Sequence, residues 1–196
     1  MKYYAVKRGR NPGIYTSWDS CLKEVKGFSN ASYKSFKKKE DAIAFMEDIG
    51  ETIEVDDETI IAYVDGSYNL KEKIYGAGVV YISKDGEEEL YESYTDDFYK
   101  HRNVAGEVRA SELAIKKALE EKREKIIIYH DYQGISSWAN DEWKANNDLT
   151  ISYKSFVKEA RKSLKIGFVK VKGHSNDKYN DWADRLAKKG ALVELG

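Results

Sequence analysis

Residues 59–95 read TIIAYVDGSYNLKEKIYGAGVVYISKDGEEELYESYT, and this stretch decides the fold. Three segments rich in β-branched and aromatic residues, 59–68, 75–83 and 87–95, are interrupted by the polar turns SYNLKEK and KDGE. Strands joined by short turns pair as antiparallel neighbours. We therefore expect a three-stranded meander.

Downstream of the meander, helix and strand patterns alternate. Apolar residues recur at helical spacing over 104–123, and the apolar run 126–130 follows as a buried strand. Residues 134–143 and 152–164 resemble helices, 167–173 a strand, and about 176–189 a final helix. The expected order β-β-β-α-β-α-α-β-α predicts an α/β fold with a mixed sheet over residues 59–196.

A smaller unit precedes this one. Within 1–49, KYYAVKRG, GIYTS and SYKSF read as strands, and residues 17–25 and KKEDAIAFMEDI read as helices. Residues 50–58 contain ETIEVDDE, with five acidic residues and no basic one, and are predicted to be a linker. We expect a small N-terminal α/β domain, an acidic linker and a larger C-terminal domain.

Composition limits the classes of function. No run of about 18 apolar residues occurs and the N-terminus is charged from Lys2, so we expect a cytoplasmic protein without membrane association. The lone Cys21 has no partner for a disulfide or a zinc site. The net charge is −1, but residues 1–50 hold ten Lys/Arg against six Asp/Glu. The basic end suits phosphate, and the acidic remainder suits cations.

Two aspartates lie at predicted strand ends: Asp65 after IIAYV and Asp131 after IIIYH. The carboxyl edge of an α/β sheet is where ligand sites form, and two neighbouring acids there can hold a divalent cation. Aspartate also starts many turns, so each residue alone favours that simpler explanation.

Two further acids lie on predicted helices. Glu107 lies in an early helical turn, where a carboxylate complements the helix dipole without further purpose. Asp184 lies in NDWADRLAKK, where Asp181 is an equally good surface acid by composition. Singly, both are ordinary helix charges. The joint pattern, with a Gly-His loop before the last helix, is more specific.

These motifs resemble type 1 ribonucleases H over residues 59–190. The matching segments are Asp65-Gly-Ser, Asn103-x-x-x-Glu107-x-x-Ala, the strand-end Asp131, and Lys-Gly-His174 followed by Asn180-x-x-x-Asp184-x-Leu-Ala. The resemblance implies a ribonuclease H-like mixed five-stranded sheet flanked by helices. It also implies endonucleolytic hydrolysis of the RNA strand of RNA–DNA hybrids, leaving 5′-phosphate and 3′-hydroxyl ends.

The same resemblance assigns the site. Four carboxylates would bind two Mg²⁺ ions, with Mn²⁺ as a substitute, and His174 would assist the chemistry; the four are Asp65, Glu107, Asp131 and Asp184. Two cations can supply both the nucleophile and the leaving-group stabilisation that phosphodiester hydrolysis requires. No relay for covalent catalysis is visible in the sequence.

Amide side chains at family positions are the expected contacts to nucleic acid: Asn103 and Gln133, with Asn69 and Asn180 as weaker candidates. Capping and turn formation would also explain these residues, more readily for Asn69 and Asn180. The segment after Asp131 is short and nearly neutral where many type 1 enzymes carry a basic protrusion. This departure predicts that the C-terminal domain alone has a weak affinity for the substrate.

Residues 2–46 resemble the hybrid-binding domain of type 1 enzymes, which is related to the caulimovirus viroplasmin domain. By position, Trp18 and Tyr33 would stack on deoxyribose and Lys34 would contact phosphate. The expected partner is nucleic acid, with no obligatory protein partner. Two alternatives remain: a catalytically inactive protein that binds hybrid or double-stranded RNA, and another ribonuclease H-like nuclease that acts on DNA.

Overall fold

The computed structural model describes residues 2–28, 31–47, 56–172 and 177–193. The chain divides into two compact units, Met1–Glu54 and Val55–Gly196. Of the predicted linker 50–58, residues 50–55 lie outside the described residues. Its last two residues are tied to the C-terminal unit, since the Asp57 carbonyl accepts from Arg123 and the Glu58 carbonyl accepts from Lys125.

The N-terminal unit has the predicted elements. They are β1 (Tyr3–Arg8), β2 (Gly13–Tyr15), α1 (Trp18–Val25), β3 (Ser32–Phe36) and α2 (Lys39–Glu47), with an antiparallel sheet ordered β2-β1-β3. The Ser17 side chain caps α1 by accepting from the Ser20 amide. Val6, Cys21 and Val25 form its small buried core.

The C-terminal unit contains the predicted mixed sheet. Its strands are β4 (Thr59–Asn69), β5 (Ile74–Ser83), β6 (Gly86–Tyr94), β7 (Lys125–His130) and β8 (Lys165–Lys170), in the order β6-β5-β4-β7-β8. The first three form the antiparallel meander, whereas β7 runs parallel to both β4 and β8. The fold class predicted from the sequence is confirmed.

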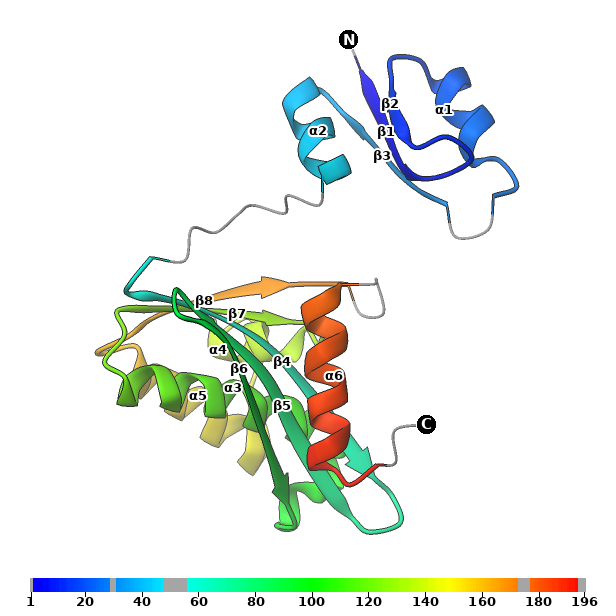
Figure 1. The fold of residues 1–196 in the computed structure, drawn as a ribbon. Coiled ribbons are helices and arrows are strands. Elements are labelled where there is room, and N and C mark those ends of the chain that lie inside the picture. Colours follow the sequence, from blue (N-terminus) through cyan, green and yellow to red (C-terminus); the bar gives the residue numbers. More distant parts are fainter. Residues whose placement is uncertain (1, 29–30, 48–55, 173–176, 194–196) are drawn as a thin grey trace. The chain divides into compact units, whose positions relative to one another are not determined.

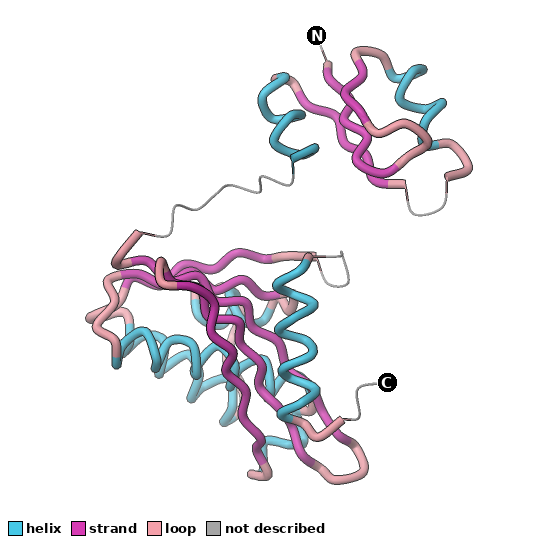
Figure 2. The backbone as a smooth tube through the Cα atoms, viewed as in Figure 1, coloured by secondary structure: helices cyan, strands magenta, loops and turns pink. Residues whose placement is uncertain are grey.

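Helices cover the two faces of this sheet unequally (Figure 1). The helices α3 (Asn103–Glu120), α4 (Gly134–Ala139) and α5 (Asp148–Ala160) share the main core with alternate β4 residues such as Ile60 and Val64. On the opposite face, α6 (Lys178–Gly190) packs Leu186 on Val80. The backbone tube in Figure 2 traces the same layers. None of the described helices is long and apolar enough to cross a membrane.

Helix boundaries differ from those predicted, for local reasons. The helix predicted over 134–143 ends at Ala139, and Asp141 follows with a left-handed φ of 63°. The next helix begins at Asp148, earlier than predicted, because Asn147 and Thr150 form a capping box. A 3-10 helix, η1 (Asp97–His101), was not predicted.

Glycines let the helices lie directly on the strands. A Cβ at Gly66 of β4 would overlap backbone atoms of Asn103 and Glu107 in α3, and one at Gly78 of β5 would overlap the α6 backbone at Ala183 and Ala187. Both helices therefore approach the same part of the sheet from opposite sides.

Candidate active site

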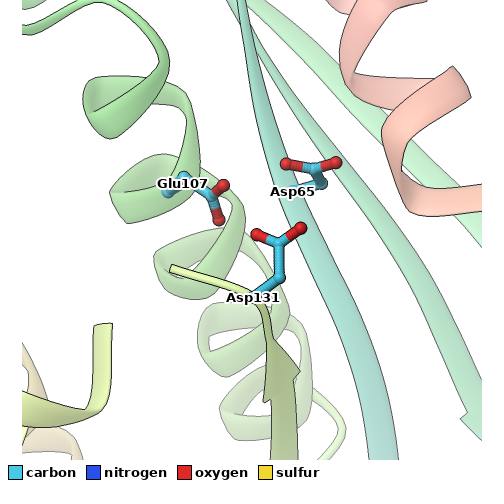
Figure 3. Close-up of side chains that lie close together, drawn as sticks. All are labelled: Asp65, Glu107 and Asp131. Atoms are coloured by element: carbon cyan, nitrogen blue, oxygen red, sulfur yellow. The ribbon is translucent and has the colours of Figure 1, made fainter. Parts of the chain in front are cut away.

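Three carboxylates from three different elements converge near the point where the parallel pairing of β4 and β7 ends (Figure 3). Asp65 comes from β4, Glu107 from α3, and Asp131 from the residue after β7. One oxygen of each lies within 4.8 Å of the others. Asp65 and Glu107 are buried, and Asp131 is half-buried.

The sheet places the two aspartates side by side. β4 and β7 are parallel, and their last paired residues are Tyr63 and Tyr129, two positions before Asp65 and Asp131. The prediction that Asp65 ends its strand is wrong, because β4 continues to Asn69 against β5. Asp65 instead marks the point where the pairing with β7 stops.

Glu107 reaches this edge because α3 lies unusually close to β4. Alternation along β4 puts Val64 and Gly66 on the α3 face and Asp65 on the other. Since Gly66 has no side chain, the α3 backbone contacts the strand directly at Glu107. The Asp65 carboxylate accepts from the Gly66 amide at 2.7 Å, which fixes its orientation.

The cluster holds negative charge in a poorly hydrated place. Burial raises the pKa of Asp65 to about 6; a hydrogen bond with the Glu107 carboxyl group opposes this rise, and the charge of Asp131 adds to it. Burial, then the charge of Asp65, raises the pKa of Glu107 well above its ordinary value. Within the described residues, Oε2 of Glu107 is buried and meets no hydrogen-bond donor. A hard divalent cation fits these oxygens, since it would satisfy the open oxygen and offset the repulsion.

Asp184 lies outside this group of three. It is on α6, half-buried, and its Oδ2 lies 2.7 Å from Lys188 Nζ, four residues along the helix. It is still near enough for its charge to raise the pKa of Asp65. Sequence reasoning did not single out Lys188, although an acid and a lysine at i and i+4 are a recognisable helix pair.

The predicted amide contacts lie in different surroundings. Asn180 is buried on α6, and its Nδ2 lies 3.5 Å from Asp131 Oδ2. Gln133 donates to the hydroxyls of Ser136 and Ser137 at the start of α4. Asn103 is exposed as the first residue of α3.

Asn69 is used in a turn. Its Oδ1 accepts from the amides of Lys71 and Glu72, and its Nδ2 donates to the carbonyl of Leu192. This is the turn-forming use that the sequence also allowed. His174 lies outside the described residues.

The N-terminal unit displays the predicted aromatic pair. Trp18 is 43% exposed and Tyr33 is 45% exposed, and their ring centroids lie 5.9 Å apart. Lys34, the next residue of β3, is exposed, and its Nζ lies 5.6 Å from the centroid of the Phe36 ring. Arg10, a further basic residue, donates from one guanidinium nitrogen to the carbonyls of Lys23 and Lys26 and so closes the C-terminal end of α1.

Comparison with known proteins agrees with this geometry. A family model described as RNase H matches residues 57–192, and one described as the ribonuclease H1 N-terminal domain matches residues 2–46. Ribonuclease H1 of Mus musculus is 24% identical, over 96% of this chain and 89% of its own. Ribonuclease H of Clostridium botulinum is 31% identical, over 65% of this chain and 92% of its own.

A solved structure shares the fold. RNase H1 from the halophilic archaeon Halobacterium salinarum NRC-1 superposes with a TM-score of 0.57 at 20% identity, over 67% of this chain and 96% of its own. Fold and site together define a class, an α/β nuclease with a carboxylate site suited to divalent cations. The chain belongs to the RNase H family, and it is a ribonuclease H with an N-terminal hybrid-binding domain.

Proposed function

We propose that the C-terminal unit hydrolyses the RNA strand of RNA–DNA hybrids internally, with two bound Mg²⁺ ions, and leaves 5′-phosphate and 3′-hydroxyl ends. Mn²⁺ is expected to substitute for Mg²⁺. The observation that carries the proposal is the convergence of Asp65, Glu107 and Asp131 within 4.8 Å, in a chain of the RNase H family.

The proposed ligands are these three acids together with Asp184. When bound, two divalent ions would supply a deprotonated attacking water and neutralise charge on the departing 3′-oxygen. Asp65, buried on β4, offers its second oxygen while the Gly66 amide holds the first. Asp184 would join after exchanging its contact with Lys188, which the approach of a cation favours.

Proton transfer is assigned to His174 in this proposal. We propose that His174 accepts or delivers a proton near the cleaved phosphate, a role worth roughly 10²- to 10⁴-fold in rate. It is an auxiliary group and not a ligand, so its replacement should leave cation affinity unchanged.

Substrate choice requires sensing a 2′-hydroxyl on one strand and its absence on the other. Asn103, exposed at the start of α3, lies four residues from Glu107 and is the best placed amide for this contact. We assign Gln133 to the RNA strand as well. Asn180, buried against Asp131, is better placed to orient that acid than to touch nucleic acid directly.

The N-terminal unit is proposed to hold the hybrid for the nuclease. Trp18 and Tyr33 offer two exposed rings 5.9 Å apart, which suits stacking on sugars of the DNA strand, and Lys34 offers a charge for phosphate. The pairing of two exposed rings supports this role, because singly exposed aromatic residues would need no explanation. Cytoplasmic location stays a prediction of the sequence.

Cleavage of three end-labelled duplexes tests the proposal. Hybrid, RNA duplex and DNA duplex of one sequence are incubated with Mg²⁺, with Mn²⁺, and with a chelator. We expect cleavage of the RNA strand of the hybrid alone, dependent on the added cation, with products that a ligase accepts because they carry 5′-phosphate and 3′-hydroxyl ends.

The same assay separates the alternatives. Binding of hybrid without cleavage under any cation would identify the inactive binding protein. Cutting of the DNA duplex would favour a different ribonuclease H-like nuclease. Activity that survives the chelator would contradict the cation site.

A further inference from the structure

His130 is a buried polar residue that the proposed chemistry does not use. It ends β7, immediately before Asp131, and is 0% exposed. Its side chain lies beside Phe168, with ring centroids 6.1 Å apart. Its Nε2 atom has no hydrogen-bond partner within the described residues. Such a residue needs a reason to be polar.

The other ring nitrogen supplies that reason. Nδ1 of His130 lies 2.9 Å from the carbonyl oxygen of Tyr132. A carbonyl can only accept, so Nδ1 carries the proton. The bond joins the residue before Asp131 to the residue after it, and so closes a small hydrogen-bonded ring of chain that contains Asp131. The same carbonyl accepts from the Ile135 amide at 3.2 Å, which links the ring to the start of α4.

Asp131 needs such support because its surroundings repel it. Its carboxylate lies near those of Asp65 and Glu107, and the amide of Asn180 approaches it only to 3.5 Å. Its backbone, in contrast, is well held, since Lys170 Nζ donates to the Asp131 carbonyl at 3.1 Å. The position of this acid is therefore set mainly through the main chain.

We propose that His130 is a positioning residue, whose Nδ1–H fixes the turn at Asp131 so that the carboxylate stays with its two partners before any cation binds. This inference rests on the proposed function, in which Asp131 is a metal ligand. Groups that orient metal ligands typically contribute 10- to 100-fold in metal affinity. The loss of this bond should therefore weaken cation binding even when the fold survives.

Two substitutions separate positioning from packing. His130→Phe keeps a ring in the core but removes the donor, whereas His130→Asn places an amide N–H near the position of Nδ1 but leaves space where the ring was. Mg²⁺ affinity is measured by calorimetry without substrate, and stability by urea unfolding. We expect His130→Phe to weaken Mg²⁺ binding about 10-fold or more, and His130→Asn to bind more tightly than His130→Phe although it is less stable.

The opposite ranking would overturn the proposal. If His130→Phe bound Mg²⁺ as the wild type does, or if affinity simply followed stability across the two variants, the imidazole would be a packing residue. The wild-type protein provides a test that needs no variant to fold. Nitrogen NMR of labelled histidine should show the His130 proton on Nδ1, and a proton on Nε2 instead would refute the hydrogen bond.

The Mg²⁺ affinity of Asp131→Asn, measured in parallel, tests the proposed function separately from the role of His130. Weak Mg²⁺ binding by Asp131→Asn together with wild-type binding by His130→Phe would refute the positioning role of His130 but leave Asp131 as a metal ligand. Wild-type Mg²⁺ binding by Asp131→Asn would remove the ligand assignment, and the positioning role with it.

Discussion

Replacing Asp65 by Asn should stabilise the metal-free protein at neutral and alkaline pH while it abolishes cation binding. Burial holds the pKa of Asp65 at about 6, against an ordinary 3.8. The folded protein therefore binds this proton more tightly than the unfolded chain does. The wild type consequently loses stability as the pH rises from about 4 to about 6, and the loss is complete above that range.

The size of the effect follows from the pKa difference. About two pKa units correspond to about 3 kcal/mol at 1.36 kcal/mol per unit, and this is an upper bound because a buried amide also has a desolvation cost. The Asn side chain keeps an oxygen for the Gly66 amide that Asp65 now binds. Since Glu107 titrates with Asp65, the observed midpoint belongs to the pair.

The effect is measured by urea unfolding in the presence of a chelator at pH 4, 6 and 8. Tryptophan emission monitors the unfolding. Three of the four tryptophans lie in the C-terminal unit. The Asp65→Asn variant should match the wild type near pH 4 and exceed it at pH 8. Asp181→Asn, at an exposed position on α6, is the control, and its stability should follow that of the wild type at all three pH values. Equal stability of Asp65→Asn and wild type at pH 8 would refute the account of a strained, buried charge.

Three further outcomes are expected. Asp131→Asn should reduce cleavage to background while hybrid binding survives, as filter binding beside a cleavage assay would show. Gly66→Ala should cost about 1–3 kcal/mol of stability and also weaken Mg²⁺ binding, because its Cβ would push α3 off β4; wild-type Mg²⁺ affinity in a folded Gly66→Ala protein would contradict this. Trp18→Ala and Lys34→Ala should weaken hybrid binding without changing the saturated single-turnover rate, and only Lys34→Ala should flatten its salt dependence; a fall in that rate would place the N-terminal unit in the active site.

The parts of the molecule that the sequence predicts are those governed by local chemistry. Alternation and turn residues in 59–95 define the meander, and the acids at the ends of parallel pairing mark the edge of the sheet. Asp65 was misplaced relative to its strand end because strand length depends on each partner, and β5 is longer than β7. The contact between Gly66 and α3 could not be predicted from local sequence either, since it joins positions about 40 residues apart. The motif points to Asp184, but its distance from the other acids depends on the competing Lys188.

The site and the fold therefore place opposite demands on the same few residues. Buried carboxylates at close range destabilise the metal-free protein, and a hydrogen bond between the carboxyl groups of Asp65 and Glu107 offsets only part of this cost. They are held by backbone features that surround them: the absence of a side chain at Gly66, the amide of that same residue, and the ring of chain closed by His130. Because each of these acts through the main chain, the carboxylates stay arranged while their charge is uncompensated. A bound cation would then relieve repulsion that the fold already bears, and this would strengthen binding without requiring a rearrangement of β4 or α3.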